Sequence, residues 1–179
     1  MTISRFWPFL FLTAGFATSC KSPLDVERDT EPLLQTERLQ YKLGPDGRAG
    51  LMKTEIPYTF VNRTGVRIVR LNCNGRIPAL LERKQGSKWV TGWIPVHNDC
   101  PGPPIVIEAG EVYRGTLHVW AAEFGSDTSP QFAFERVEGI YRIRWEDALR
   151  SEFPDQEPLG EELPLEVRIS NSFVLKGSF

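Results

Sequence analysis

The sequence is poor in the residue types on which several kinds of site depend. It has 3 cysteines and 2 histidines among 179 residues, which leaves little for a metal centre built from imidazole and thiolate. Its 21 basic and 23 acidic side chains give a formal charge of -2, so no overall basic field attracts a phosphate backbone. We therefore expect no cofactor, no metal site and no nucleic acid partner.

Familiar catalytic motifs are also missing. The chain contains no Gly-x-Ser-x-Gly, His-Glu-x-x-His or phosphate-binding loop. His97 and Asp99 beside Cys100 are too few for zinc, which takes three or four protein ligands, and we interpret them as part of a surface loop. His118 lies in an alternating segment, where we expect it on one face of a sheet. These absences predict that the protein is not an enzyme.

Hydrophobic runs are short except near the start of the chain. A polar start with one positive charge, residues 1–5, precedes an apolar stretch from Phe6 to Phe16. Helix of that length reaches roughly 16 Å, about half of the hydrocarbon core, which is too short for a permanent transmembrane helix. The layout predicts a signal peptide, and no later segment is apolar for long enough to span a membrane.

The residues Ala17-Thr18-Ser19-Cys20 follow this stretch directly. They resemble the lipobox of bacterial lipoproteins, although the family usually has Leu where Ala17 stands. The resemblance implies a signal peptide over residues 1–19, lipid on Cys20 and attachment to the membrane surface. The alternative is ordinary cleavage after Ala17 or Ser19, which would release a soluble secreted protein.

Lys21 follows the cysteine, where an Asp tends to retain lipoproteins of Gram-negative bacteria in the inner membrane. The resemblance therefore implies the outer membrane. Several acyl chains, worth about 0.8 kcal/mol for each buried methylene, would hold the protein there almost irreversibly. Residues 20–37 are largely polar and charged, and we interpret them as a flexible tether.

From residue 38 onward the hydrophobic pattern is that of β-strands. Leu39, Tyr41 and Leu43 alternate with polar residues and end at a Gly-Pro-Asp-Gly turn. Similar segments recur to the end of the chain, with turn signals between them. We expect strands around residues 58–60, 66–73, 79–83, 88–94, 105–107, 111–120, 141–145, 165–169 and 173–175. Some eight or nine strands without a long helix predict one all-β domain over residues 38–179, an antiparallel two-sheet sandwich.

The features that suggest a family are Tyr58–Asn62, Cys73, the Gly86 turn before Trp89, Cys100, Ile107–Gly110 and Glu138–Ile143. Their order is similar to an immunoglobulin-like sandwich of the kind found in uncharacterised bacterial lipoproteins. The resemblance implies a tyrosine corner at Tyr141, in which the hydroxyl bonds a nearby backbone group. An antibody-type disulfide is not implied, because Ile143 stands where its second cysteine would be.

Cys73 and Cys100 remain as a pair if Cys20 carries lipid. Export takes the pair to an oxidising compartment. A disulfide across their 26 intervening residues would stabilise the fold by roughly 3 to 4 kcal/mol in the chain-entropy account. We expect a structural disulfide, because a redox pair usually has a Cys-x-x-Cys arrangement.

Three further features are candidates for binding or modification. Trp89 and Trp93 share a face of one predicted strand and would form a patch for a peptide or carbohydrate if exposed. Residues 146–166 carry eight acidic side chains, which could hold calcium weakly. Their spacing is not that of a calcium loop, so we favour a solvated connection. Asn62-Arg63-Thr64 matches an N-glycosylation acceptor, a chance match beside a bacterial leader.

The sequence therefore predicts a lipid-anchored protein of the bacterial cell envelope with a non-enzymatic interaction or structural role. Its partners would be the membrane, through the lipid on Cys20, and an envelope protein or glycan that the sequence does not identify. One alternative is a secreted or periplasmic inhibitor or accessory subunit that docks a loop into an enzyme. A small hydrolase with an unfamiliar site is another.

Overall fold

The computed structural model describes residues 31–48, 50–73, 78–96, 102–146, 148–150 and 161–177. The signal peptide, Cys20, most of the tether, His97, Asp99 and Cys100 lie outside these residues, and what we expect of them stays a prediction. Within the described part of the chain, no helix is long and apolar enough to cross a membrane.

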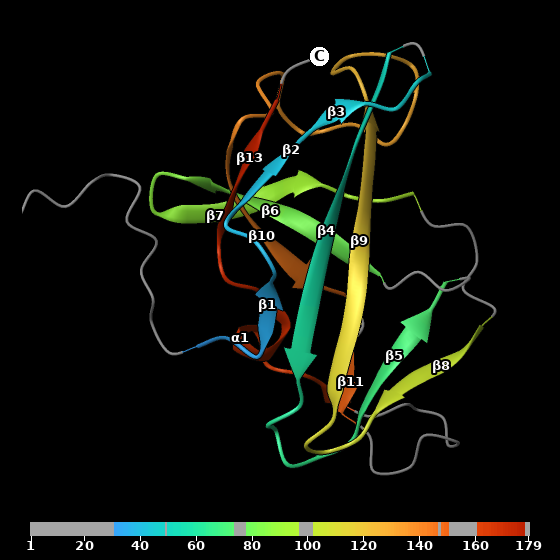
Figure 1. Cartoon of the computed structure of the whole chain (residues 1–179), viewed down its shortest axis with the longest axis vertical. Helices are drawn as coiled ribbons and strands as arrows, with labels where there is room; N and C mark the ends of the chain where they lie inside the picture. Colours follow the sequence, from blue (N-terminus) through green and yellow to red (C-terminus); the bar gives the residue numbers. More distant parts are fainter. Residues whose placement is uncertain are drawn as a thin grey trace, which may run out of the picture.

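Nearly all of the regular structure is β, which confirms the expected class (Figure 1). The strands are β1 (Leu34–Thr36), β2 (Gln40–Lys42), β3 (Gly44–Pro45), β4 (Leu51–Val61), β5 (Ile68–Asn72), β6 (Ala79–Gln85), β7 (Lys88–Trp93), β8 (Gly102–Ile107), β9 (Val112–Ala122), β10 (Gly139–Trp145), β11 (Ala148–Arg150), β12 (Glu161–Glu162) and β13 (Phe173–Lys176). One short helix, α1 (Leu165–Arg168), lies before the last strand.

The described strands form three hydrogen-bonded sheets. In the first, β4 pairs with β1 and β3 along one side and with β9 along the other. The second has the order β2-β13-β10-β6-β7, and the third the order β12-β11-β5-β8. β4 continues into β5 and β8 into β9, so the connections at 62–67 and 108–111 divide one long pairing into two sheets.

β4 and β9 form the longest ladder, and Figure 1 shows them side by side along the length of the molecule. They pair from Leu51↔Ala122 to Val61↔Val112 without a bulge. One side of this two-stranded ribbon faces the core, where Tyr58 meets Trp145 of β10, with 6.0 Å between ring centroids. Both rings are buried, and burial of such large apolar surfaces fixes the ribbon against the second sheet.

Tyr141 forms the predicted tyrosine corner. Its hydroxyl donates a buried hydrogen bond to a backbone carbonyl oxygen four residues earlier. The segment 124–134 contains turns and two isolated bridges and no strand.

The predicted shared face of Trp89 and Trp93 is wrong. The pairing of β7 with β6 shifts between Leu81 and Glu82, so that Gly92 is an extra residue in β7. An extra residue changes the side of the sheet to which the next side chain points. Trp93 is therefore in the core and 1% exposed, whereas Trp89 is only partly buried, opposite Lys84 on the outer side.

Two other segments differ from the sequence-based expectation. Residues 34–36 belong to β1, not to the tether, because Leu34 is fully buried and pairs with Phe60. Leu165–Arg168 form α1 instead of a strand. Alternation over five residues is too short to separate a strand from one helical turn, and Pro164 suits the start of a helix.

Candidate functional site

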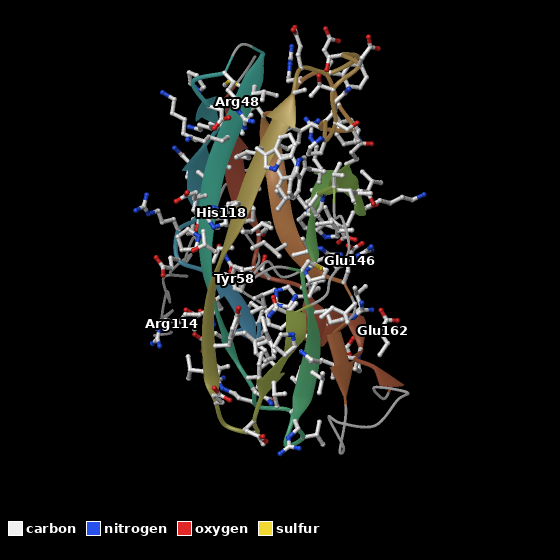
Figure 2. All side chains as sticks on the ribbon, turned by 90° about the vertical axis from the view of Figure 1, so that its right-hand side faces the viewer. Arg48, Tyr58, Arg114, His118, Glu146 and Glu162 are labelled. Carbon is white, nitrogen blue, oxygen red and sulfur yellow. The ribbon has the colours of Figure 1, made fainter. Side chains whose placement is uncertain are left out.

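The outer face of the β4–β9 ribbon carries a group of polar and aromatic side chains that point away from the core. Because successive side chains of a strand alternate, every second residue of each strand lies on this face. The outer face consists of Lys53, Glu55, Pro57 and Thr59 from β4 and Arg114, Thr116, His118 and Trp120 from β9. Figure 2 places His118 and Arg114 on one side of the molecule together with Arg48, and Glu146 and Glu162 on the opposite side.

One end of the outer face is hollowed. The hollow has a volume of about 390 Å³, and its polar and aromatic lining comes from three places in the chain. Asp46 and Arg48 belong to the turn between β3 and β4, Lys53 and Glu55 to β4, and His118 and Trp120 to β9. The ladder places Lys53 opposite Trp120 and Glu55 opposite His118.

Asp46 holds both cations of the hollow. Its carboxylate forms one ion pair with Arg48 and a second with Lys53, in which Nζ lies 3.2 Å from Oδ1 of Asp46. The hydrogen bond from Arg48 is the main cause that lowers the pKa of Asp46 below its usual value. The Asp46 side chain is 11% exposed, whereas both cations are more than half exposed. The two cations therefore keep donors that face solvent.

The other end of the hollow holds an acid and an imidazole. Nδ1 of His118 lies 3.4 Å from Oε1 of Glu55, and both side chains are largely exposed. This placement confirms that His118 is a sheet-face residue. The partly buried Trp120 indole belongs to the cationic end, opposite Lys53, with Cζ of Arg48 6.0 Å from its ring centroid.

The edge of β9 that faces away from β4 carries unpaired backbone groups. In antiparallel pairing, alternate residues direct their N–H and C=O groups toward the partner strand or away from it. The carbonyl oxygen of Trp120 points away from β4, because it accepts a 3.0 Å hydrogen bond from Nε1 of Trp93. Arg114, Thr116 and His118 share that direction, and no backbone partner for them occurs in the described part of the chain.

A second polar cluster lies on the outer side of the second sheet. The Glu82 carboxylate accepts hydrogen bonds of 2.6 Å from Arg142 and 2.9 Å from Arg144. Arg142 also stacks over Trp89, with Cζ 4.4 Å from the ring centroid. Glu82 is buried and Arg142 is mostly covered. The polar groups of this cluster therefore use one another as hydrogen-bond and ion-pair partners. The Trp89 half of the predicted patch is thus partly occupied by Arg142.

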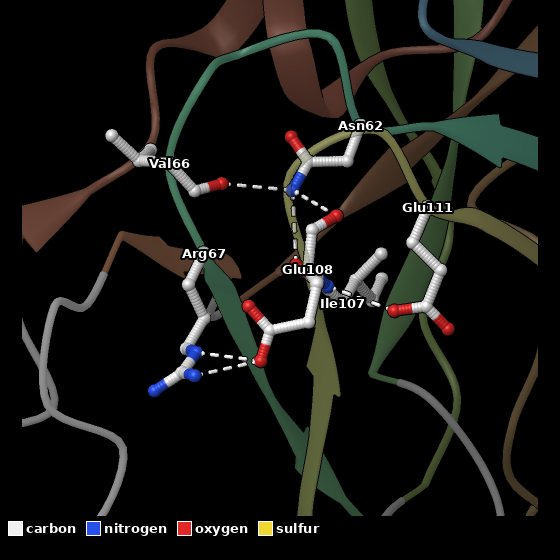
Figure 3. Close-up of polar contacts among 6 residues, drawn as sticks. All are labelled: Asn62, Val66, Arg67, Ile107, Glu108 and Glu111. Carbon is white, nitrogen blue, oxygen red and sulfur yellow. Dashed lines mark hydrogen bonds and ion pairs between the residues drawn. The ribbon is translucent and has the colours of Figure 1, made fainter.

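Asn62 is a structural residue rather than an exposed acceptor of sugar (Figure 3). It is fully buried, and its Nδ2 donates to the carbonyl oxygens of Val66, Ile107 and Glu108 at 2.8, 2.9 and 3.0 Å. Its Oδ1 accepts a hydrogen bond from the Thr64 hydroxyl. The side chain ties together the two connections that divide the long β4–β9 pairing from β5–β8.

The remaining predicted site residues are only partly described. Cys73 is 4% exposed and follows the last residue of β5. Its expected partner Cys100 lies outside the described residues, and so does most of the acidic stretch. Glu162, at the end of that stretch, forms an ion pair with Arg168 of α1. No group of three or more metal-ligating side chains occurs within the described ranges.

Sequence reasoning missed the hollow. Arg48 lies in a turn, and Lys53 is far from Trp120 in the chain. Only the register of β4 with β9 brings Lys53 and Trp120 together. The alternation of polar residues along both strands was the available signal, but it gives no register. No known protein-family profile matches the sequence, and a comparison with curated proteins finds no match either.

Proposed function

We propose that the protein is a lipid-anchored, non-enzymatic interaction module of the bacterial cell envelope. The observation that carries the proposal is the open edge of β9. An edge strand with outward N–H and C=O groups is a template for an added strand, in which main-chain hydrogen bonds give affinity and alternate side chains give specificity. Arg114, Thr116 and His118 provide six such backbone groups, and Arg114 adds a cation without an ion pair in the described part of the chain.

The proposed mechanism is the presentation of this edge from a fixed scaffold. The β4–β9 ladder is continuous, and its inner face is anchored by aromatic packing. A partner strand would therefore meet a preformed edge and would not have to order it, which reduces the entropic cost of binding.

A proline substitution tests the edge without breaking the ladder. Thr116 lies opposite Pro57, and its N–H points away from β4, so Thr116→Pro removes only an outward donor. Thr116→Val is the matched control because it keeps the N–H. We would place a photo-crosslinking amino acid at His118 in the full chain, expressed in bacteria, and compare the adducts of the two variants.

We expect an adduct with an envelope protein in the Thr116→Val chain and its loss in the Thr116→Pro chain. The same crosslinker at Lys88, an exposed position in the β6–β7 hairpin of another sheet, should not give this adduct. Equal adducts from both variants, or the same adduct from Lys88, would show that the edge is not the interaction surface.

The lipid anchor is a separate part of the proposal and rests on the sequence Ala17-Thr18-Ser19-Cys20. Its test is the intact mass of the full chain purified from bacterial membranes, compared with a Cys20→Ala variant. We expect a chain that begins at Cys20 and carries a diacylglyceryl-sized increase, which the variant lacks. A chain cut after Ala17 or Ser19 without lipid would instead indicate a freely diffusing secreted domain.

A disulfide between Cys73 and Cys100 and an immunoglobulin-like arrangement of the sheets complete the proposal. The pairing of Asn72 with Gly102 supports the disulfide, since Cys73 and Cys100 are one and two residues from this pair. The tyrosine corner supports the immunoglobulin-like arrangement. Peptide mapping under non-reducing conditions would detect the linked Cys73 and Cys100 peptides, and separate peptides would contradict the disulfide.

The second candidate function is an inhibitor or accessory subunit that inserts a loop into an enzyme. It is favoured by Phe124, which is 48% exposed beside a loop that one side chain holds in place. The Gln131 amide accepts a hydrogen bond of 2.9 Å from the N–H of Gly125 and donates one of 2.8 Å to the carbonyl oxygen of Thr128. A fixed loop with an exposed aromatic ring is suited to docking. Loss of enzyme binding in Phe124→Ala, with the β9 variants unaffected, would favour this function.

A further inference from the structure

The hollow at the end of the β4–β9 ribbon combines an aromatic surface with two cations, two carboxylates and an imidazole. Its lining includes the Trp120 indole, Arg48 and Lys53 at one end, and Glu55 with His118 at the other. We propose that the hollow binds an acidic sugar, a pyranose that carries a carboxylate. This inference does not depend on strand addition, because the side chain of His118 lines the hollow, whereas strand addition would use only its backbone groups.

The cationic end is prepared for a carboxylate. Asp46 fixes Arg48 and Lys53 on one carboxylate, and the three groups together keep one net positive charge. Arginine has five N–H donors and lysine three, so a single carboxylate leaves several donors unused. An arriving carboxylate at this end, away from Glu55, would meet charge-assisted donors whose positions are already set.

Trp120 supplies the surface for the sugar ring. The indole is partly buried, and its strand is held at this point by the hydrogen bond from Trp93 to the Trp120 carbonyl oxygen. An indole presents a large, rigid apolar surface, which suits the C–H face of a pyranose and costs little conformational entropy. The position of Lys53 directly opposite Trp120 places the cation at the edge of this surface.

Glu55 and His118 provide hydrogen-bond partners for the hydroxyl groups of the sugar. The Glu55 carboxylate accepts hydrogen bonds, and a neutral His118 imidazole both accepts and donates. Two adjacent cross-strand pairs cover an area of about 5 by 7 Å, from the spacing between strands and along them. One sugar ring spans a comparable area, so the carboxylate, the ring face and the hydroxyls can each meet the group that suits it.

Binding is tested with the full chain in detergent, a galacturonic acid tetramer as the probe and maltotetraose as the neutral probe. Calorimetry and tryptophan fluorescence would be measured for the unchanged chain and four variants. Trp120→Ala and Lys53→Gln alter the hollow. Trp89→Ala and Lys88→Gln are the matched controls, since they change a partly buried tryptophan and an exposed lysine on another sheet.

We expect saturable binding of the acidic tetramer, weakened by about tenfold or more in each hollow variant and unchanged in each control, as for the loss of a well-placed contact. Maltotetraose should not saturate. Absence of saturable binding, equal binding of the neutral probe, equal weakening in the controls, or full competition by sulfate at the same concentration would overturn the inference. Thr116→Pro should bind the tetramer normally, so a failure of one proposal is distinguishable from a failure of the other.

Discussion

The hydroxyl of Tyr141 donates a 2.7 Å hydrogen bond to the carbonyl oxygen of Val137, and the bond is buried. This bond joins the start of β10 to the loop that enters it. Arg83 of β6 holds the same loop from another side, with hydrogen bonds of 2.8 Å to the carbonyl oxygens of Arg136 and Glu138. The loop that precedes β10 is therefore fixed by side chains from two neighbouring strands.

Removal of the Tyr141 hydroxyl should destabilise the domain. Tyr141→Phe leaves the buried Val137 carbonyl oxygen without this donor, and such a loss costs about 1 to 3 kcal/mol. Urea unfolding followed by tryptophan fluorescence would measure the change in the free energy of unfolding. Tyr113→Phe, at a half-buried position, is the control and should cost less. Equal effects of the two substitutions would contradict a special role for the corner.

The domain should lose stability in alkaline solution between about pH 10 and pH 12. Burial is the main cause that raises the pKa values of Tyr58 and Tyr141 to about 12 from an ordinary value of 10.0. Between pH 10 and pH 12 the folded protein keeps tyrosine protons that the unfolded chain releases. The stability that these two tyrosines contribute is therefore complete below pH 10 and is lost as the pH rises through their folded-state pKa values.

A shift of this size corresponds to roughly 2 to 3 kcal/mol for each tyrosine. The check is the free energy of unfolding measured from pH 8 to pH 12 for the unchanged chain and for Tyr141→Phe. The variant should have a smaller alkaline loss of stability, because one of the two tyrosines whose pKa is raised to about 12 is absent. Identical pH profiles would contradict the assignment.

Asn62 should tolerate no substitution that removes its amide. Asn62→Ala leaves three backbone carbonyl oxygens without the donor they share and removes the nearer of the two acceptors of the Thr64 hydroxyl. Loss of a fully buried polar network of this kind costs about 3 kcal/mol. Thermal unfolding should detect the change, whereas Thr64→Val should cost less because the three amide bonds survive. A variant as stable as the unchanged chain would rule out a structural role for this side chain.

Gly92 is required by the bulge that buries Trp93. A Cβ atom at this position would lie 2.8 Å from Cε1 of Tyr141 and 3.1 Å from Cβ of Arg83. Gly92→Ala should therefore destabilise the domain by about 1 to 3 kcal/mol, the usual cost of overpacking. Gly44→Ala is the control, because nothing lies within 4 Å of a Cβ atom there. Chemical denaturation of both variants would decide, and equal stabilities would contradict the expectation.

Most of the longer strands and the local corner could be predicted from the sequence, but β1 and the candidate site could not. Alternation identified β4 in part, β9 and β10, because its signal lies within one strand. The tyrosine corner spans only four residues and was predicted with its hydrogen bond. The hollow depends on the register of Lys53 with Trp120, two residues that are far apart in the chain. The hydrophobic pattern within one strand does not indicate which residue of another strand lies opposite.

The sequence by itself determined the all-β class, the local turns and the absence of familiar catalytic motifs, because these depend on residue type and on periods of a few residues. The tertiary structure decided which side chains face outward and which strand edge stays open. A single extra residue at Gly92 buries Trp93, and the lack of a neighbouring strand in the described chain leaves Thr116 at an open edge. Both outcomes depend on how strands pair with one another, where one shift in register changes the face to which the following side chains point.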